Sequence, residues 1–263
     1  MIVKKIGLNN EQLVNKEENL IITIGAFDGI HLGHKKLFLE LNEEKNKKGD
    51  NYKTAVLTFE KHPDFYLNKR NEDFIIESNK NRYNEFETFD IDYLFLLEKD
   101  VLSLSYELFH QNVLNKINTK VVIVGEEFRY GFKAQGNIDT LKEDYVVKTF
   151  LVLKNNGEKV SSTEIRSLLS EGKINEASKL LGHNYCIDCF INRTGNDILL
   201  LEKKDGNIAL AKGCYEVKYN IKNEEYYGIA TVTEKMVMPQ KSNFFQMRCN
   251  EEVKIEFLKY LGK

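Results

Sequence analysis

Residues 21–34 read Ile-Ile-Thr-Ile-Gly-Ala-Phe-Asp-Gly-Ile-His-Leu-Gly-His, and this stretch decides the fold. The first four residues are a β-branched run that favours a buried strand, and the glycine at position 25 ends it. A helical pattern follows from about His34 to Asn46, so the stretch predicts a strand, a glycine-rich loop and a helix in succession. A loop between the carboxyl end of a strand and the start of a helix is a common place for phosphorylated ligands in α/β proteins.

Further strand-like runs recur through the first 185 residues. They lie at Ala55–Phe59, Tyr93–Leu96, Val121–Val124 and Val146–Val152, and a helical pattern covers Ser103–Asn115. The runs are apolar without alternation, which is typical of strands in a parallel sheet that helices cover on both faces. The sequence therefore predicts an α/β fold with a doubly wound, Rossmann-like parallel sheet.

The pattern changes after about Thr163. Helices are predicted at Thr163–Ser170 and Asn175–Leu181, and a last helix near Glu251–Tyr260. Between them, turn residues separate four short strand-like segments: Cys189–Asn192, Ile198–Leu201, Cys214–Tyr219 and Tyr226–Val232. We therefore expect two domains, an α/β domain over residues 1–185 and a small antiparallel, β-barrel-like domain over residues 186–263.

Composition excludes several classes of protein. Of 263 residues, 42% are hydrophobic, enough for a sizeable core, so wholesale disorder is excluded. The 38 Lys and Arg nearly balance the 40 Asp and Glu, so no global positive field favours nucleic acid as a partner. No apolar run approaches the roughly 18 residues that span a bilayer, and the N-terminus has no signal-peptide pattern. We expect a cytoplasmic protein without membrane contact, and the sequence favours no particular oligomeric state.

The four cysteines, at positions 186, 189, 214 and 249, lie in the last third of the chain. Cys186 and Cys189 form a single Cys-x-x-Cys pair, without the second pair that a structural zinc site needs. Free thiols are expected in a cytoplasmic chain, with metal binding or redox chemistry as alternatives.

The loop at residues 25–34 has the densest set of candidate functional residues. Glycines at positions 25, 29 and 33 allow the backbone to approach a ligand closely. His31 and His34 lie one helical turn apart at the start of a helix, where free N–H groups attract anions. The pattern predicts a phosphate site. A plain glycine turn with two surface histidines and a zinc site are the alternatives.

A second candidate lies at residues 160–166, which read Val-Ser-Ser-Thr-Glu-Ile-Arg. Hydroxyl groups at the start of a helix cap it or bind phosphate oxygens, and Arg166 follows one turn later. Alone, this stretch is a capping box with an ordinary arginine. Together with the two histidines it predicts a site that grips a triphosphate from two sides.

Four motifs in order resemble one known family. Residues 25–34 and 161–166 are similar to the nucleotide-binding motifs in the adenylyltransferase module of bacterial FAD synthetases. Thr-Phe-Glu-Lys-His-Pro at residues 58–63 resembles that family's Thr-Phe-x-Pro-His-Pro, and residues 125–131 resemble its Gly-x-Asp-Phe-x-Phe-Gly. The match covers about residues 15–185. Members belong to the His-x-Gly-His nucleotidyltransferases and usually carry a fused riboflavin kinase domain.

The resemblance implies transfer of AMP from MgATP to FMN, giving FAD and pyrophosphate, with no protein ligands assigned to the magnesium. Positioning and neutralisation of phosphate charge would supply the catalysis. The implied catalytic residues are His31, His34, Asp28 and Arg166. The implied ATP-binding residues are Gly25, Phe27, Gly29, Gly33, Ser161, Ser162 and Thr163. The implied flavin-binding residues are Phe59, His62, Pro63, Glu127, Phe128 and Arg129.

Two positions depart from the family pattern. Lys61 stands where the family usually has proline, and Glu127 replaces an aspartate. Both lie in the flavin-side motifs, so an altered flavin affinity is expected. For Phe59 and Phe128, plain core packing is the alternative to flavin contact.

The tail lacks the kinase motif. No Gly-Arg-x-x-Gly-Phe-Pro-Thr-Ala-Asn string is present, although residues 212–217 and 226–230 still resemble strands of the kinase barrel. The sequence predicts an FMN adenylyltransferase without riboflavin kinase activity. The alternatives are a bifunctional enzyme, a related nucleotidyltransferase with another acceptor, and a non-catalytic protein that binds flavin or nucleotide.

Overall fold

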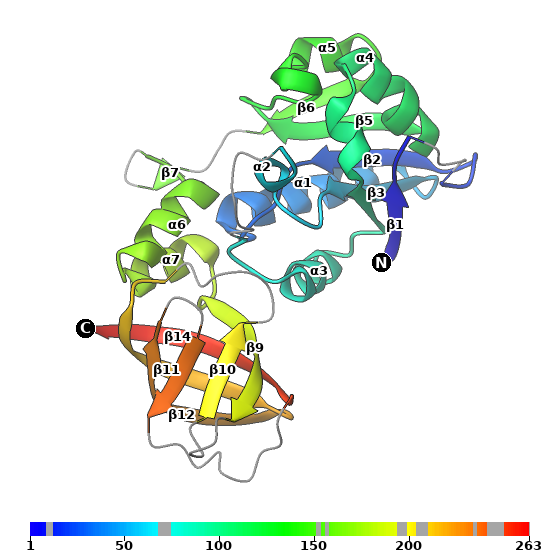
Figure 1. Ribbon diagram of the computed structural model, residues 1–263. Helices are drawn as coiled ribbons and strands as arrows, with labels where there is room; N and C mark the ends of the chain where they lie inside the picture. The colour runs from blue at the N-terminus through cyan, green and yellow to red at the C-terminus, as the bar shows by residue number, and fades with distance from the viewer. Residues whose placement is uncertain are drawn as a thin grey trace. The chain divides into compact units, whose positions relative to one another are not determined.

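The structure is a computed structural model that describes residues 1–8, 13–67, 75–150, 154–155, 158–193, 199–203, 210–233, 236–240 and 250–262. The chain forms two compact units (Figure 1). The first consists of Met1–Phe27, Gly33–Lys69 and Lys80–Lys159; the second consists of Asp28–Leu32, Arg70–Asn79 and Val160–Lys263. The loop with the His-x-Gly-His motif therefore begins in one unit, passes through the other and returns at Gly33.

A six-stranded sheet, parallel throughout, forms the centre of the first unit, which confirms the predicted doubly wound fold. Its strand order is β1 (Ile2–Ile6), β4 (Tyr93–Leu97), β3 (Tyr52–Thr58), β2 (Asn19–Ile24), β5 (Thr119–Gly125) and β6 (Val146–Phe150). The chain winds outward from β2 in one direction and then from β5 in the other. The switch point, where such sheets bind ligands, thus lies between β2 and β5.

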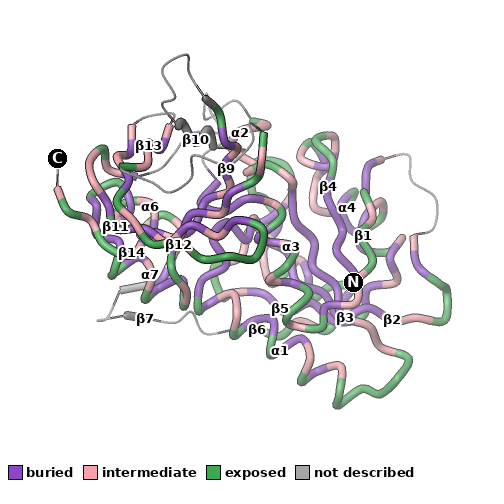
Figure 2. Tube along the Cα trace, turned by 90° about the horizontal axis from the view of Figure 1, so that it is seen from below, coloured by how far each residue is buried: buried purple, intermediate pink, exposed green. Residues whose placement is uncertain are grey.

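Helices cover both faces of this sheet (Figure 1). Right-handed crossovers place α1 (Leu32–Lys48) and α3 (Asn79–Thr88) on one face, and α4 (Tyr106–Phe109) and α5 (Ile138–Lys142) on the other. The rings of Phe38 on α1 and Phe86 on α3 pack with centroids 5.4 Å apart. The central strands are buried almost without interruption (Figure 2), as the apolar runs of β2, β3 and β5 require.

The predicted helix at Ser103–Asn115 is broken into short pieces. A 3-10 turn, η1 (Lys99–Ser103), precedes α4, which Ser105 caps by accepting a hydrogen bond from the Leu108 amide. A π-helical segment, η2 (His110–Leu114), and a 3-10 turn, η3 (Asn115–Ile117), follow. The short elements α2 (Pro63–Tyr66), η4 (Phe132–Ala134), β7 (Lys154–Asn155) and β8 (Glu158–Lys159) complete this unit. Strand β6 ends at Phe150, and the last two residues of its predicted range lie outside the described residues.

A closed antiparallel barrel and two helices, α6 (Ser162–Ser170) and α7 (Ile174–Leu181), form most of the second unit. The barrel order is β10 (Leu199–Lys203), β13 (Met236–Gln240), β12 (Glu224–Val232), β11 (Gly213–Ile221), β14 (Glu252–Gly262) and β9 (Cys186–Arg193). Residue 198, the first of the predicted Ile198–Leu201 segment, lies outside the described residues. The barrel-like domain is confirmed, while the functional boundary at residue 185 stays a prediction.

The predicted helix near Glu251–Tyr260 is wrong, because this segment is strand β14. Val253, Ile255 and Phe257 are buried, and Lys254 and Glu256 between them are half-buried. This alternation has the period of two that a strand needs to place one face in a barrel interior. Pairing with both β11 and β9 then supplies the backbone hydrogen bonds.

The cysteines agree with free thiols. Cys186 and Cys189 are buried on β9, Cys214 is half-buried on β11, and Cys249 lies outside the described residues. Burial raises the pKa of the Cys186 thiol to about 12. No group of three or more His, Cys, Asp or Glu side chains that could hold a metal ion occurs among the described residues.

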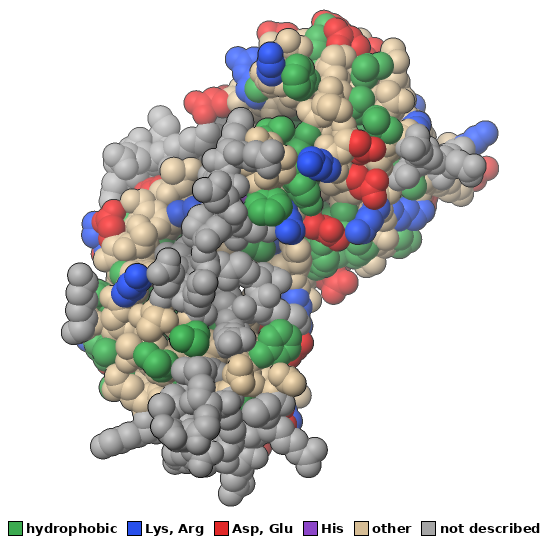
Figure 3. Space-filling model, viewed as in Figure 1, with side chains coloured by type: hydrophobic (Ala, Val, Ile, Leu, Met, Phe, Trp, Pro, Cys, Tyr) green, Lys and Arg blue, Asp and Glu red, His purple; other side chains and the backbone are tan. Residues whose placement is uncertain are grey.

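Two further features of the molecule concern membrane-spanning helices and the distribution of surface charge. Within the described part of the chain, no helix is both long and apolar enough to cross a bilayer. On the face of the first unit drawn in Figure 3, basic and acidic side chains lie interspersed, without a broad field of one sign.

Candidate functional site

A cavity of about 720 Å³ lies in the first unit, where the chain leaves β2, β3 and β5. Its volume is in the range of small-molecule sites, and its lining is mostly apolar. Five of the predicted site residues line it: Gly25, Phe59, Pro63, Phe128 and Arg129. The other lining residues include Tyr130, which lies in the stretch 125–131, and several to which the sequence did not point, among them Leu97, Val101, Leu102, Phe109 and Phe132.

Three charged side chains border this cavity: Asp64, Arg129 and Lys133. Asp64 lies in the first turn of α2, where the Nδ1 atom of His62 accepts a hydrogen bond from its amide at 3.2 Å. His62 therefore acts as the helix cap, and Pro63 occupies the first turn, a position that suits its fixed φ. Neither His62 nor the exposed Glu127 is among the described residues that line the cavity.

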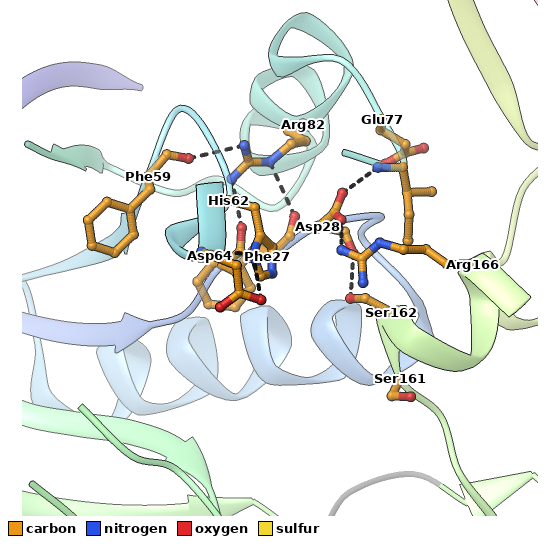
Figure 4. A network of polar contacts seen from close by, with 12 residues as sticks. Phe27, Asp28, Phe59, His62, Asp64, Glu77, Arg82, Ser161, Ser162 and Arg166 are labelled. Carbon is orange, nitrogen blue, oxygen red and sulfur yellow. Dashed lines mark hydrogen bonds and ion pairs between the residues drawn. The ribbon is translucent and has the colours of Figure 1, made fainter. Parts of the chain in front are cut away.

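Arg82, on α3, is a buried residue that the sequence did not reveal; only 1% of it is exposed. Its guanidinium donates to the carbonyls of Ala26 at 2.8 Å and Phe27 at 3.2 Å, in the loop after β2. It also donates to Thr58 Oγ1 (2.9 Å) at the end of β3, and to Phe59 O (3.2 Å) and Glu60 O (3.5 Å) in the loop that follows. One side chain thus ties together two of the loops that border the cavity (Figure 4).

Phe27 and His34 pack against each other in the first unit. Phe27 is buried with a φ of 46°, a backbone conformation that few residues with a β-carbon adopt. Its ring meets the His34 imidazole edge to face at 5.0 Å and also packs against Phe38. Gly33 is buried in the first turn of α1. Phe27 is therefore a core residue that orients the imidazole of His34.

A charged cluster in the second unit surrounds Asp28, which is 2% exposed. Its Oδ1 accepts a hydrogen bond from the Ile76 amide at 2.6 Å, and its Oδ2 pairs with the guanidinium of Arg166. The Ser162 hydroxyl donates to the Asp28 carbonyl at 2.6 Å (Figure 4). Asp28 thus joins the loop to the first turns of α6 and fixes the direction of Arg166.

The N-terminus of α6 also explains the neighbouring hydroxyl residues. Ser161 caps the helix by accepting a hydrogen bond from the Glu164 amide at 3.2 Å, so the capping interpretation holds for this residue. Thr163 is exposed in the first turn. Its hydroxyl is therefore accessible to a ligand at the helix start.

A second buried carboxylate, Glu77, holds the segment Asp28–Leu32 from another side. Its Oε2 accepts from the Ile30 amide at 3.2 Å, and its Oε1 lies 2.5 Å from Nε2 of His183. Gly29 has a φ of +60°, and a β-carbon there would lie 2.8 Å from the Ile76 side chain, so only glycine fits. His31, next in this segment, is 6% exposed.

Comparison with known proteins is consistent with this geometry. A family model described as FAD synthetase matches residues 13–164. The chain is 35% identical over 245 residues to a bifunctional riboflavin kinase/FMN adenylyltransferase of Buchnera aphidicola subsp. Schizaphis graminum, covering 86% of this chain and 76% of that protein. It is 28% identical over 216 residues to an FAD synthetase of Listeria monocytogenes, covering 77% of this chain and 82% of that protein.

A solved structure supports the fold alone. It is described as a macrolide-efflux protein from Streptococcus pneumoniae and superposes with a TM-score of 0.82 at 23% identity, covering 100% of this chain and 92% of that one. The family match spans strands β2 to β6 of the sheet, the residues that line the cavity and the first residues of α6. The chain belongs to the FAD synthetase family.

Proposed function

We propose that this protein is an FMN adenylyltransferase. A phosphate oxygen of FMN attacks the α-phosphorus of ATP, a new P–O bond forms, and the bond between the α-phosphorus and the bridging oxygen breaks to release pyrophosphate. The observation that carries the proposal is the apolar cavity of about 720 Å³ at the switch point, in a chain of the FAD synthetase family. The products are FAD and pyrophosphate.

The flavin ring system is proposed to occupy this cavity. Phe59 and Phe128 supply aromatic surface for the isoalloxazine, and Pro63 adds an apolar edge. Arg129 and Lys133 supply positive charge for the FMN phosphate. His62 acts through the helix that it caps, and Glu127 is proposed to act from the rim, because neither lines the cavity.

The triphosphate is proposed to bind to the His-x-Gly-His residues and to the start of α6. His31 and His34 contact ATP phosphates beside the α1 N-terminus, with Gly25, Phe27, Gly29 and Gly33 shaping the backbone. Arg166, Ser162 and Thr163 bind the β- and γ-phosphates. Asp28 holds the Arg166 guanidinium in the bound direction, which saves reorganisation when charge develops on the leaving pyrophosphate. No side-chain nucleophile is needed.

Magnesium is proposed to enter with ATP. Mg²⁺ keeps several waters and prefers substrate phosphate oxygens with one or two protein oxygens. The cytoplasm stays the predicted compartment, because ATP and FMN are available there.

Residues 186–263 are proposed to lack riboflavin kinase activity. The kinase string is missing from the sequence, although the barrel is complete. A bifunctional enzyme is the competing function, because several relatives are named so.

The test is incubation of the purified chain with FMN and MgATP, with separation of the flavins and measurement of pyrophosphate. FAD and pyrophosphate should form in equal amounts, and removal of Mg²⁺ with EDTA should stop both. Bound but unconverted FMN would contradict the proposal and favour a flavin-binding protein. Conversion of another phosphorylated acceptor in place of FMN would favour a related nucleotidyltransferase.

A further inference from the structure

A chain of three hydrogen-bonded side chains runs to the wall of the cavity within the first unit. Nδ1 of His110 lies 2.6 Å from the Asp144 carboxylate, and Nε2 of His110 lies 2.6 Å from the Tyr130 hydroxyl. The Tyr130 hydroxyl also lies 2.9 Å from the hydroxyl of Thr140. Tyr130 lines the cavity, while His110 does not.

One residue in this chain of contacts, Tyr130, is a further departure from the family motif, beside Lys61 and Glu127. Residues 125–131 read Gly-Glu-Glu-Phe-Arg-Tyr-Gly and resemble Gly-x-Asp-Phe-x-Phe-Gly, so Tyr130 stands at the second phenylalanine. The tyrosine adds only a hydroxyl group, and that hydroxyl contacts His110, the first residue of the π-helical segment η2. Such segments change the direction of a helix locally and are frequent at functional sites.

Burial makes the contact between His110 and Tyr130 important. Tyr130 is 7% exposed and His110 is 3% exposed, so a lost partner would leave a polar atom without water. Burial raises the pKa of Tyr130 to about 12, so its phenol stays neutral and keeps its proton. A carboxylate only accepts hydrogen bonds, so Nδ1 of His110 donates to Asp144, and Nε2 and the Tyr130 hydroxyl form the second hydrogen bond of the ring.

The rings of Tyr130 and His110 also belong to a stack that includes Phe128. Phe128 and Tyr130 stack with centroids 5.6 Å apart and an interplanar angle of 8°, and Tyr130 and His110 stack at 5.8 Å and 10°. Two of these three rings, Phe128 and Tyr130, line the cavity. The hydroxyl anchor of Tyr130 therefore fixes the orientation of an aromatic surface on which a flat ligand would rest.

We propose that His110 and Asp144 are positioning residues for flavin binding, which hold the Tyr130 ring in the cavity wall through its hydroxyl group. The inference rests on the proposed function, because it assigns the flavin to this cavity. The loss of these contacts should lower the affinity for FMN. The ATP-binding residues lie in other segments of the chain, so the Michaelis constant for ATP should not respond.

The first part of the test is a pair of single variants, Tyr130→Phe and His110→Leu, assayed for FAD formation and for FMN binding by flavin fluorescence. Tyr130→Phe removes the hydroxyl partner of Nε2 of His110, and His110→Leu removes one of the two partners of the Tyr130 hydroxyl, which keeps Thr140. The loss of a buried hydrogen bond corresponds to about a tenfold effect. We expect KM for FMN and the FMN dissociation constant to rise about tenfold. KM for ATP should change less than about twofold.

The double variant Tyr130→Phe/His110→Leu is the decisive part. It removes both polar partners and leaves two apolar side chains of similar shape, an exchange that is close to neutral. FMN affinity should recover to within about threefold of the unaltered protein, and not fall by the product of the single effects.

Tyr145→Phe is the matched control. Its hydroxyl bonds Asn115 at 2.7 Å and its ring meets His110 at 5.1 Å, but Tyr145 is not among the described residues that line the cavity. An equal rise in KM for FMN in this control, or single variants with unchanged FMN affinity, would overturn the inference. A double variant whose FMN affinity falls by the product of the two single effects would overturn it as well. Failure of the unaltered chain to form FAD would contradict the proposed function. The FMN titrations would still show whether His110 supports flavin binding.

Discussion

The parallel sheet of the first unit and the barrel of the second are both complete folds, but they use their side chains differently. At the switch point of the sheet, loops after β2, β3 and β5 border a cavity of about 720 Å³. The barrel interior is instead filled by large side chains, among them Tyr215, Tyr219 and Phe257, each exposed by 1% or less. A parallel sheet leaves its loop end free for a ligand, whereas a small barrel packs its own centre. A barrel can therefore keep its fold after its functional motif is lost.

The largest effect on FAD formation is expected from Arg166→Ala. The change removes the positive charge that Asp28 orients and leaves this carboxylate buried without the ion pair. We expect kcat/KM for ATP to fall about a hundredfold or more, measured by steady-state formation of FAD.

The control for this change is Lys173→Ala, which removes a cation from an exposed pair with Glu171 in the same unit. It should leave FAD formation unchanged. If the Arg166 and Lys173 variants form FAD at the same rate, Arg166 does not belong to the ATP-binding site.

Arg82→Met should have the next largest effect. Methionine keeps much of the apolar stem but donates to none of the five oxygens at the end of β3 and in the loops after β2 and β3. We expect a loss of about 2–4 kcal/mol in the free energy of unfolding, measured with urea. KM for FMN should also rise. A variant as stable as the unaltered protein would show that the two loops hold their positions without Arg82.

Phe257→Leu tests whether packing inside the barrel affects stability without affecting FAD formation. The ring is fully buried against Tyr215 at 5.3 Å, so the smaller side chain should cost about 1–3 kcal/mol of stability. At a temperature where the variant stays folded, KM for FMN and ATP should remain within about twofold. A large change in either constant would mean that the barrel contributes to the adenylyltransferase site.

The smallest effect is expected from thiol modification. Cys186 and Cys189 are buried, and burial keeps the pKa of Cys186 at about 12, so its reactive thiolate is scarce at neutral pH. Half-buried Cys214 should react with iodoacetamide before either of them, with FAD formation unchanged. Mass spectrometry after limited modification gives the order. Early labelling of Cys186 would show that strand β9 opens readily.

The sequence predicted the sheet well because its signal is local. Strands β2 and β5 are mostly apolar; Gly25 follows β2 and Gly125 ends β5, so short windows are enough to place them. The segment of strand β14 was wrongly predicted to be a helix. Its few apolar residues alternate with charged ones, and so short a pattern fits the helical period of 3.6 as well as the strand period of two. The separate pieces η1, α4 and η2 depend on tertiary contacts that a helical pattern does not contain.

The candidate site was predictable where a motif is contiguous, as at residues 25–34 and 161–166. Its supporting residues were not, because their partners lie far away in sequence. Glu77 accepts from Ile30 and bonds His183, Arg82 reaches back to Ala26, and His110 joins Asp144 to Tyr130. No local pattern distinguishes these side chains from surface residues, and burial alone gives them their importance.

The flavin products of the purified chain distinguish an FMN adenylyltransferase from a bifunctional enzyme. Equal samples of the purified chain receive MgATP with either FMN or riboflavin, in the presence of pyrophosphatase, and the flavins are separated after the same interval. We expect FAD from FMN, and neither FMN nor FAD from riboflavin. FMN formed from riboflavin would show that the barrel retains kinase chemistry, and FMN recovered unchanged would contradict the adenylyltransferase itself.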